Sequence, residues 1–133
     1  MSAKCFFDTN VLIYAFASND PRGEKAEALL SEGGVIGVQV INEFTNVARR
    51  KLGWSWTQTE AALAVIDELL DPPFALTAEI HKQAIGLAKN HSLSFYDALI
   101  VAAAINAGSK TLLTEDMQHG RKFGSMRVEN PFR

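Results

Sequence analysis

The segment at residues 4–16, KCFFDTNVLIYAF, decides the fold class because it joins a short strand to a helix through an acidic turn. Residues 4–7 are typical of a buried strand, and residues 11–16 predict an apolar helix. The same alternation recurs along the chain, with strands predicted at 35–38, 74–76, 111–114 and 126–129 and helices at 22–31, 39–52, 57–70, 78–90 and 95–107. Such alternation predicts a parallel sheet with helices on both faces.

Length and composition indicate one globular domain covering residues 1–133, with 47% apolar and 21% charged residues. The net charge of −2 lacks the basic balance of a stable non-specific nucleic-acid binder, so nucleic-acid contacts would have to be local or metal-assisted. Cys5, the single cysteine, excludes an intramolecular disulfide and is interpreted as a core residue. Without a signal peptide or an apolar run of about 20 residues, we expect a cytoplasmic protein with no membrane contact.

Four acidic residues fall where the carboxyl ends of the predicted strands meet. Asp8 follows the first strand and Asp116 follows a later one. Glu43 lies about one turn into the helix after the second strand, and Asp97 lies in the first turn of the helix opened by Ser94. Because helical side chains tilt toward the helix N-terminus, Glu43 and Asp97 lean toward that same edge. The sequence thus predicts one shared site there.

Each acid also has a purely structural interpretation. Asp8 and Asp116 fit N-caps, Asp97 fits a capping box, and Glu43 suits the positive end of its helix dipole. Apolar neighbours on both sides of Asp97 and Glu43 nevertheless favour a cleft over open water.

Four clustered carboxylates repel one another unless a divalent cation neutralises them. Hard oxygen ligands suit Mg²⁺ or Mn²⁺. A cation of this kind activates water and stabilises charge on a phosphate, so the acids predict phosphodiester hydrolysis.

Polar residues beside the acids suit a supporting role. Thr9, Asn10 and Thr114 can donate hydrogen bonds to carboxylates or to a bound water, although ordinary turn chemistry would also account for them. The three histidines are scattered and form no cluster with zinc spacing, so surface or structural roles are expected for them.

Two basic segments are candidates for phosphate contacts. Arg121 and Lys122 follow Asp116 closely and are predicted to hold a phosphate. The run at residues 49–51 could also meet RNA phosphates, but a favourable helix C-terminus is the preferred interpretation.

Four segments together resemble the motifs of the PIN domain family. The order, approximate spacing and total length agree, so the resemblance covers nearly the whole chain. The segments are Phe7-Asp8-Thr9-Asn10-Val11-Leu12, Asn42-Glu43-Phe44, Tyr96-Asp97-Ala98-Leu99-Ile100 and Leu113-Thr114-Glu115-Asp116-Met117.

The resemblance implies an α/β fold, a three-layer α/β/α sandwich with a central parallel sheet, and Mg²⁺- or Mn²⁺-dependent endoribonuclease activity. It also implies catalytic and metal-binding roles for four acids, with one or two metal ions. Glu115 stands beside the fourth acid, so the sequence does not decide which of the two residues points into the site. Asp116 is preferred. The implied acids are Asp8, Glu43, Asp97 and Asp116.

Small single-domain members of this family are mostly VapC-type toxins of prokaryotic toxin–antitoxin pairs. The resemblance therefore implies an RNA substrate, a cognate antitoxin and a homodimer. The predicted helices at 22–31 and 57–70 carry apolar faces that suit such a partner, although ordinary core packing explains them slightly better.

Three other functions are compatible with parts of the pattern. Phosphatases with an aspartyl nucleophile usually place a second Asp two residues after the first, where this chain has Asn10. A receiver domain would carry adjacent acids at the end of the first strand, which Phe7-Asp8 does not supply. A catalytically inactive module that binds nucleic acid or protein is the remaining alternative, and a phosphodiesterase assay distinguishes it.

Overall fold

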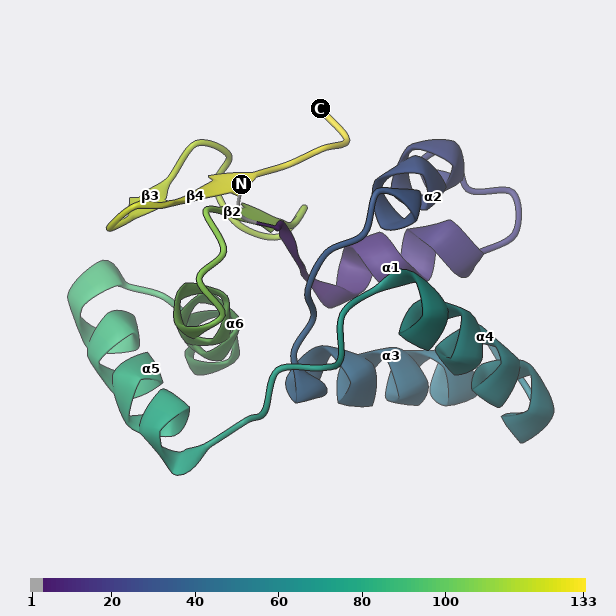
Figure 1. Ribbon diagram of the computed structural model, residues 1–133, viewed down its shortest axis with the longest axis horizontal. Coiled ribbons are helices and arrows are strands. Elements are labelled where there is room, and N and C mark those ends of the chain that lie inside the picture. The colour runs from purple at the N-terminus through teal and green to yellow at the C-terminus, as the bar shows by residue number, and fades with distance from the viewer. Residues whose placement is uncertain (1–3) are drawn as a thin grey trace.

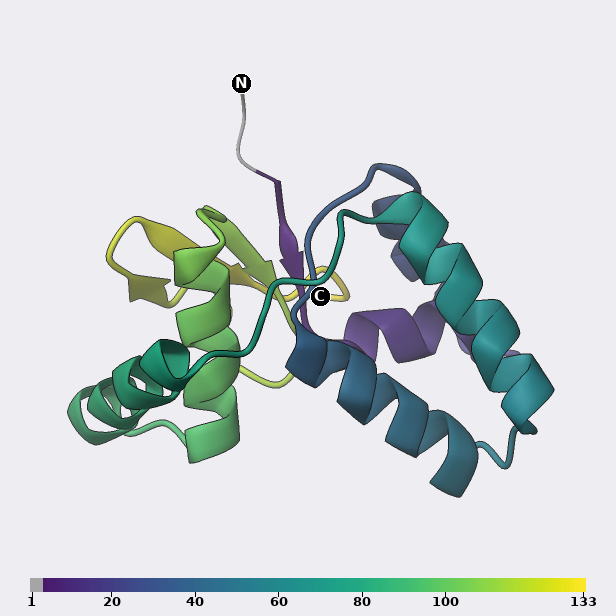
Figure 2. The same ribbon diagram turned by 60° about the horizontal axis from the view of Figure 1, so that its bottom comes forward.

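The computed structural model describes residues 4–133, which form six helices and a four-stranded sheet. In both ribbon views, α5 and α6 lie on one side of β1 and α1 to α4 lie on the other (Figures 1 and 2). The elements are β1 (Phe6–Phe7), α1 (Thr9–Phe16), α2 (Gly23–Ser31), α3 (Val38–Arg50), α4 (Trp56–Leu69), α5 (Ala78–His91), α6 (Phe95–Asn106), β2 (Thr111–Leu113), β3 (Lys122–Phe123) and β4 (Met126–Glu129).

The sheet is mostly parallel, as predicted. Its strands follow the order β1-β2-β4-β3, with β1–β2 and β2–β4 parallel and β3–β4 antiparallel. Phe6 pairs with Leu112 and Phe7 with Leu113, so residues 8 and 114 leave the sheet at the same edge. This register brings the first and fourth acidic segments together.

Two predicted strands are wrong in extent. Residues 35–38 and 74–76 contribute only isolated parallel bridges, Phe6 to Val35 and Gly37 to Phe74. The reason is that α3 begins at Val38, with Gly37 as its N-cap, and draws the backbone away from the sheet. The antiparallel strand β3 was not predicted, because two residues are too short to show an alternating pattern.

Helix caps fix the two helix starts most relevant to the sequence predictions. Ser94 caps α6 as predicted, and its hydroxyl accepts a hydrogen bond from the backbone N–H of Asp97. The predicted cap at Thr57 is wrong, because Ser55 caps α4 and forms a capping box with Gln58. Both Ser-x-x-Gln and Thr-x-x-Glu fit the capping-box pattern, so the sequence alone does not choose between them.

The core forms around β1. Phe6 and Phe7 are 0% and 1% exposed, which accounts for an apolar strand without polar alternation. Cys5 is partly buried, packs against this core, and burial raises the pKa of its thiol. Within residues 4–133 no helix is both long enough and apolar enough to cross a membrane.

Gly34 allows the chain after α2 to pass directly over β1, and replacing it should be costly. A Cβ atom at position 34 would lie 2.3 Å from a ring carbon of Phe7 and 2.8 Å from the carbonyl oxygen of Cys5. We expect Gly34→Ala to lower the free energy of unfolding by about 3 kcal/mol. The added methyl group would require the backbone of β1 and the buried ring of Phe7 to shift. Chemical denaturation measures this change.

Gly86 provides the matched control for that substitution. It lies inside α5, and a Cβ there would meet nothing within 4 Å. Gly86→Ala should therefore stabilise the protein by roughly 0.5–1 kcal/mol through helix propensity. Equal effects of the two substitutions would contradict the close approach at Gly34.

Candidate active site

Asp8 joins the end of β1 to the start of α1. It is the N-cap of α1, and one carboxylate oxygen accepts a hydrogen bond from Thr9 N–H at 2.7 Å. The other oxygen accepts a hydrogen bond from the Thr114 hydroxyl at 2.8 Å. The pKa of Asp8 is raised to about 6, chiefly by burial and also by the charges of Asp116 and Glu43, against the lowering effect of these hydrogen bonds. Asp8 is thus both a structural junction and a carboxylate in unfavourable negative surroundings.

Glu43 lies half-buried on α3, and both of its carboxylate oxygens accept hydrogen bonds. The Thr9 hydroxyl donates to Oε2 at 2.7 Å, and the Gln39 amide donates to Oε1 at 2.9 Å. Gln39 also donates to the backbone carbonyl of Tyr96 at 3.3 Å, which links α3 to the start of α6. Sequence reasoning missed Gln39, although its position one helical turn before Glu43 was a usable signal.

Asp97 lies in the first turn of α6 and is half-buried. Its pKa is raised chiefly by burial and also by the negative charges of Asp116 and Glu43. Glu43 and Asp116 therefore act electrostatically on both Asp8 and Asp97. The structure brings the four predicted acids into one electrostatic neighbourhood.

Asp116 and Glu115 point to different surroundings. Asp116 accepts a hydrogen bond from the Asn10 side chain at 3.0 Å, and its own N–H donates to the Thr114 hydroxyl. Glu115 instead pairs with Arg22 at 3.0 Å and accepts a hydrogen bond from the Tyr14 hydroxyl.

This difference predicts opposite results for two neighbouring amides. For the endoribonuclease activity that the resemblance implies, Glu115→Gln should keep RNA cleavage near the wild-type rate and lower the free energy of unfolding by at most about 1 kcal/mol, because it weakens only a partly exposed ion pair. Asp116→Asn should reduce cleavage at least about 100-fold, because it removes a charge from the acidic group. Cleavage rates on one RNA, with unfolding curves for both variants, measure this. A larger rate loss in Glu115→Gln would reverse the assignment.

A cleft of about 540 Å³ opens beside two of the acids. Glu43 and Asp116 line it together with their hydrogen-bonding partners Thr9 and Asn10. Its remaining lining residues come from α1, from α3 and from the two residues that follow α3, and they are Ile13, Tyr14, Asn46, Val47, Lys51 and Leu52. The cleft is therefore large enough for part of an extended polymer and is acidic at one end.

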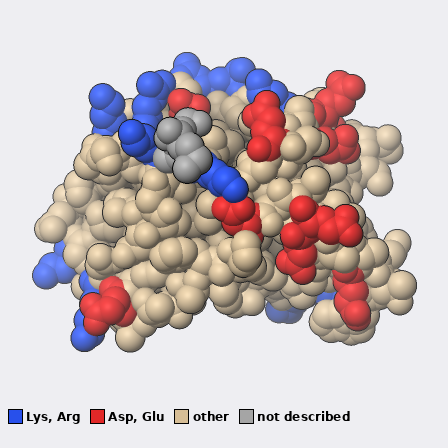
Figure 3. Space-filling view, in the orientation of Figure 1, with Lys and Arg blue, Asp and Glu red and all other residues tan. Residues whose placement is uncertain are grey.

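The predicted phosphate contacts Arg121 and Lys122 do not line this cleft. The Arg121 guanidinium donates to the backbone carbonyl of His91 and lies over the Phe123 ring. In Figure 3, lysine and arginine side chains gather over the β3–β4 hairpin, whereas acidic side chains gather over the α2 and α4 side. Within residues 4–133 no hydrogen bond or ion pair joins either residue to the four acids.

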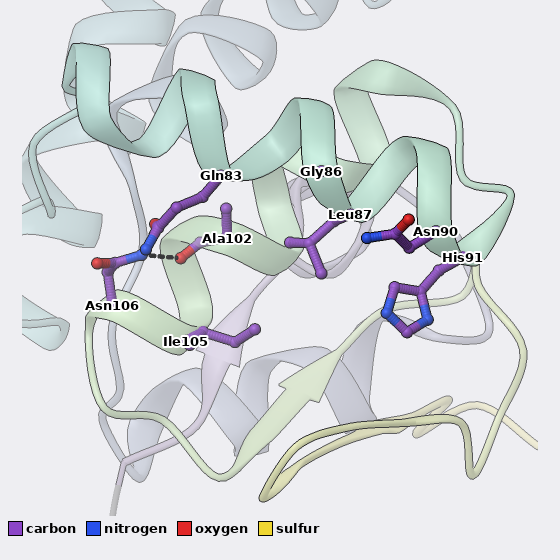
Figure 4. A pocket seen from close by; sticks show the side chains of 8 residues that line it. All are labelled: Gln83, Gly86, Leu87, Asn90, His91, Ala102, Ile105 and Asn106. Atoms are coloured by element: carbon purple, nitrogen blue, oxygen red, sulfur yellow. Dashed lines mark hydrogen bonds between the residues drawn. The ribbon is translucent and has the colours of Figure 1, made fainter.

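A second hollow, of about 300 Å³, lies between α5 and α6. Figure 4 shows its side chains, which include Gln83, Leu87, Asn90 and His91 from α5 and Asn106 from α6. No carboxylate among residues 4–133 lines it, so it does not fit the hydrolytic chemistry predicted from the sequence. The cleft beside Glu43 and Asp116 remains the candidate site.

The donor set fits a hard divalent cation in chemistry and in charge. The acids are oxygen donors, and two of them have raised pKa values in part because of the other two. In the described part of the chain, however, no three His, Cys, Asp or Glu side chains converge closely enough to form a ready-made metal site. Binding one ion by several acids therefore requires side-chain rotation.

Comparison of the sequence with known protein families identifies the family of this chain. Residues 5–122 match the sequence model of the PIN domain. The chain belongs to the PIN domain family. A curated PIN-domain relative, Ribonuclease VapC3 of Pyrobaculum aerophilum, is 32% identical over 117 residues, which span 80% of this chain and 86% of the relative.

Solved structures show the same PIN fold. A toxin–antitoxin complex from Klebsiella pneumoniae gives a TM-score of 0.72 at 21% identity, covering 96% of this chain and 97% of the other. VapBC2 of Rickettsia felis, bound to a promoter DNA fragment, gives a TM-score of 0.69 at 19% identity, covering 95% of this chain and 97% of the other. Mycobacterium tuberculosis VapC20 is described as a toxin that cleaves the sarcin–ricin loop. It gives a TM-score of 0.66 at 23% identity, covering 81% of this chain and 86% of the other.

Proposed function

We propose that this PIN domain is an Mg²⁺- or Mn²⁺-dependent endoribonuclease that hydrolyses RNA phosphodiester bonds. The observation that carries the proposal is that Glu43 and Asp116, which line an open cleft, act electrostatically on both Asp8 and Asp97. The identity to a relative named as a ribonuclease supports it.

The side chains divide the chemistry between them. Asp8 and Asp97 are proposed to hold the principal cation, with Glu43 and Asp116 completing or extending the site. When bound, the cation would supply Lewis acidity and would neutralise the negative charge that develops on the scissile phosphate. Thr9, Asn10 and Thr114 orient the carboxylates through the hydrogen bonds described above.

Asp116 is the better candidate to accept the proton of the attacking water. Both oxygens of Glu43 already accept hydrogen bonds from Thr9 and Gln39. In Asp116, which lines the cleft, Oδ2 accepts a hydrogen bond from Asn10, and no side chain or backbone group among the described residues donates to Oδ1. The proton of the water therefore goes to Asp116 Oδ1 in this proposal.

Cleavage of total cellular RNA by the purified protein tests the function. Reactions contain Mg²⁺, Mn²⁺ or a chelator, and the protein is first shown by circular dichroism to be folded. Cleavage that requires the cation supports the proposal. Folded protein that cleaves no RNA with either metal would move the assignment to a non-catalytic binding module.

We further propose that the chain acts as one cytoplasmic domain whose activity an antitoxin restrains, and that it forms a homodimer. Two of the similar structures are described as a toxin–antitoxin complex and as VapBC2. Exposed apolar residues on α4, Trp56 and Val65, offer surface for a partner. Sedimentation of the purified chain tests the dimer, and co-purification with the product of the adjacent gene tests the antitoxin.

A further inference from the structure

One face of α3 forms a wall of the candidate cleft. Glu43, Asn46, Val47 and Lys51 all line it, and their spacing of three, four and eight residues from Glu43 places them along one side of a helix. The cleft therefore runs along α3, from the acidic end toward the C-terminus of the helix.

Lys51 lies at the far end of this wall. It follows Glu43 by eight residues, which corresponds to about 12 Å along the helix axis at the standard rise per residue. Along the helix axis, the backbone of Lys51 is thus separated from that of Glu43 by more than the length of one phosphate group. Lys51 is the one lysine or arginine among the cleft-lining residues of the described chain.

The neighbouring basic residues have other positions. Arg49 donates to the Trp54 carbonyl at 2.7 Å and lies 4.3 Å from the centre of the Trp56 ring. Arg50 is exposed and does not line the cleft. Arg49 and Arg50 also supply positive charge to the last turn of α3, so that role does not require Lys51 to face the cleft.

Lys51 has the properties of an anion-binding side chain. It is exposed, and within residues 4–133 it takes part in none of the ion pairs. A lysine ammonium is a compact charge with three donors, which suits a phosphate oxygen. Ile13, Val47 and Leu52 give the cleft an apolar surface that suits a base or a ribose.

From this arrangement we propose that Lys51 binds a non-scissile phosphate of an RNA strand lying along α3. The inference rests on the proposed ribonuclease function and adds a direction to it. The strand extends from the acids toward the C-terminus of α3, and Lys51 acts in substrate binding rather than in bond cleavage. The contact carries no base specificity, because every nucleotide presents a phosphate.

Lys51→Gln tests the contact by removing the charge while nearly preserving side-chain length. Arg50→Gln is the matched control, because it removes the adjacent charge from outside the cleft. We expect Lys51→Gln to raise KM about 5- to 10-fold and to reduce the slope of log KM against log salt by about 0.7, the value for one contact with a single strand. Arg50→Gln should change KM less than twofold, and Lys51→Arg should restore most of the binding.

Neutral linkages locate the phosphate. Short RNA substrates carry one methylphosphonate, which is uncharged, at successive positions on each side of the cleavage site. At one position away from cleavage the neutral linkage should raise KM for the wild type and leave KM of Lys51→Gln unchanged. The Lys51 contact would be overturned if the neutral linkage and Lys51→Gln raised KM independently at every position. It would also be overturned if Lys51→Gln and Arg50→Gln had equal KM values. Neither result would contradict cleavage by the wild type. Absence of wild-type cleavage would instead remove the ribonuclease proposal, and this inference with it.

Discussion

Replacing Asp97 by Asn should reduce RNA cleavage at least about 100-fold while leaving the fold intact, a loss typical of removing one charge-stabilising group from an active site. Asp97 is half-buried at the start of α6. The cap of that helix is a hydrogen bond from the Asp97 backbone N–H to Ser94, which the substitution retains. Asn has the size of Asp but lacks the charge that we propose holds the cation. Single-turnover cleavage of a defined RNA in Mn²⁺ gives the rate.

Glu79→Gln is the control for that measurement. Glu79 occupies the first turn of α5, where Thr77 caps the helix in the same way that Ser94 caps α6, but Glu79 is exposed and lies outside the cleft. Cleavage by Glu79→Gln should equal that of the wild type. Metal-dependent cleavage that persists in a purified Asp97→Asn variant would show that Asp97 does not belong to the catalytic group.

Asp8→Asn should stabilise the cation-free protein at neutral and alkaline pH by about 2 kcal/mol, although it removes activity. Asp8 is 5% exposed, and burial raises its pKa from 3.8 to about 6. At about 1.36 kcal/mol per pKa unit, ionising Asp8 in the folded protein costs about 3 kcal/mol relative to the unfolded chain. Loss of one hydrogen bond to Thr9 or Thr114 offsets about 1 kcal/mol of the gain.

The sign of this effect fixes its pH dependence. Between pH 3.8 and about 6 the folded wild type binds more protons at Asp8 than the unfolded chain, so the contribution of Asp8 to stability falls as pH rises. The advantage of Asp8→Asn should therefore be small near pH 4 and fully developed above pH 7. Denaturant unfolding in chelator at several pH values measures it, with Asp71→Asn, a more exposed acid paired with Lys4, as the control for loss of a carboxylate outside the site.

Addition of Mn²⁺ should reverse the order of stability. A cation that binds the folded state stabilises the wild type by an amount that grows with the logarithm of its concentration over the dissociation constant, whereas Asp8→Asn has lost a ligand. A wild type that gains no stability from Mg²⁺ or Mn²⁺ would argue against metal binding at Asp8. Equal unfolding curves in chelator at pH 8 would argue against the raised pKa.

The four acids could be proposed from sequence because their positions depend on local rules. Asp8 follows a fully apolar pair of residues, and Asp97 follows a serine that caps its helix, so strand end and helix start are both readable. The parallel arrangement then brings separate strand ends to one edge. The pairing of Phe6 with Leu112 and of Phe7 with Leu113, which places Asp8 beside Thr114, had to be supplied by the structure.

Other features depend on tertiary packing and were not readable. Residues 35–38 look like a full strand, but the start of α3 at Val38 limits them to single bridges. The assignment of phosphate contacts followed sequence proximity to Asp116, whereas the cleft is lined by Lys51, which is distant in sequence from Asp116. The direction of the Arg121 side chain depends on its contact with His91 in another element.

The hydrogen bond from Thr114 to Asp8 joins residues 106 positions apart, and β1 can pair with β2 only after residues 111–113 have been synthesised. During translation, Asp8 leaves the ribosome early but cannot be placed until the segment at 111–116 has followed it. Non-local pairing of this kind forms late in folding. The proposed ribonuclease activity should therefore be absent from a growing chain until residues 111–116 have left the ribosome.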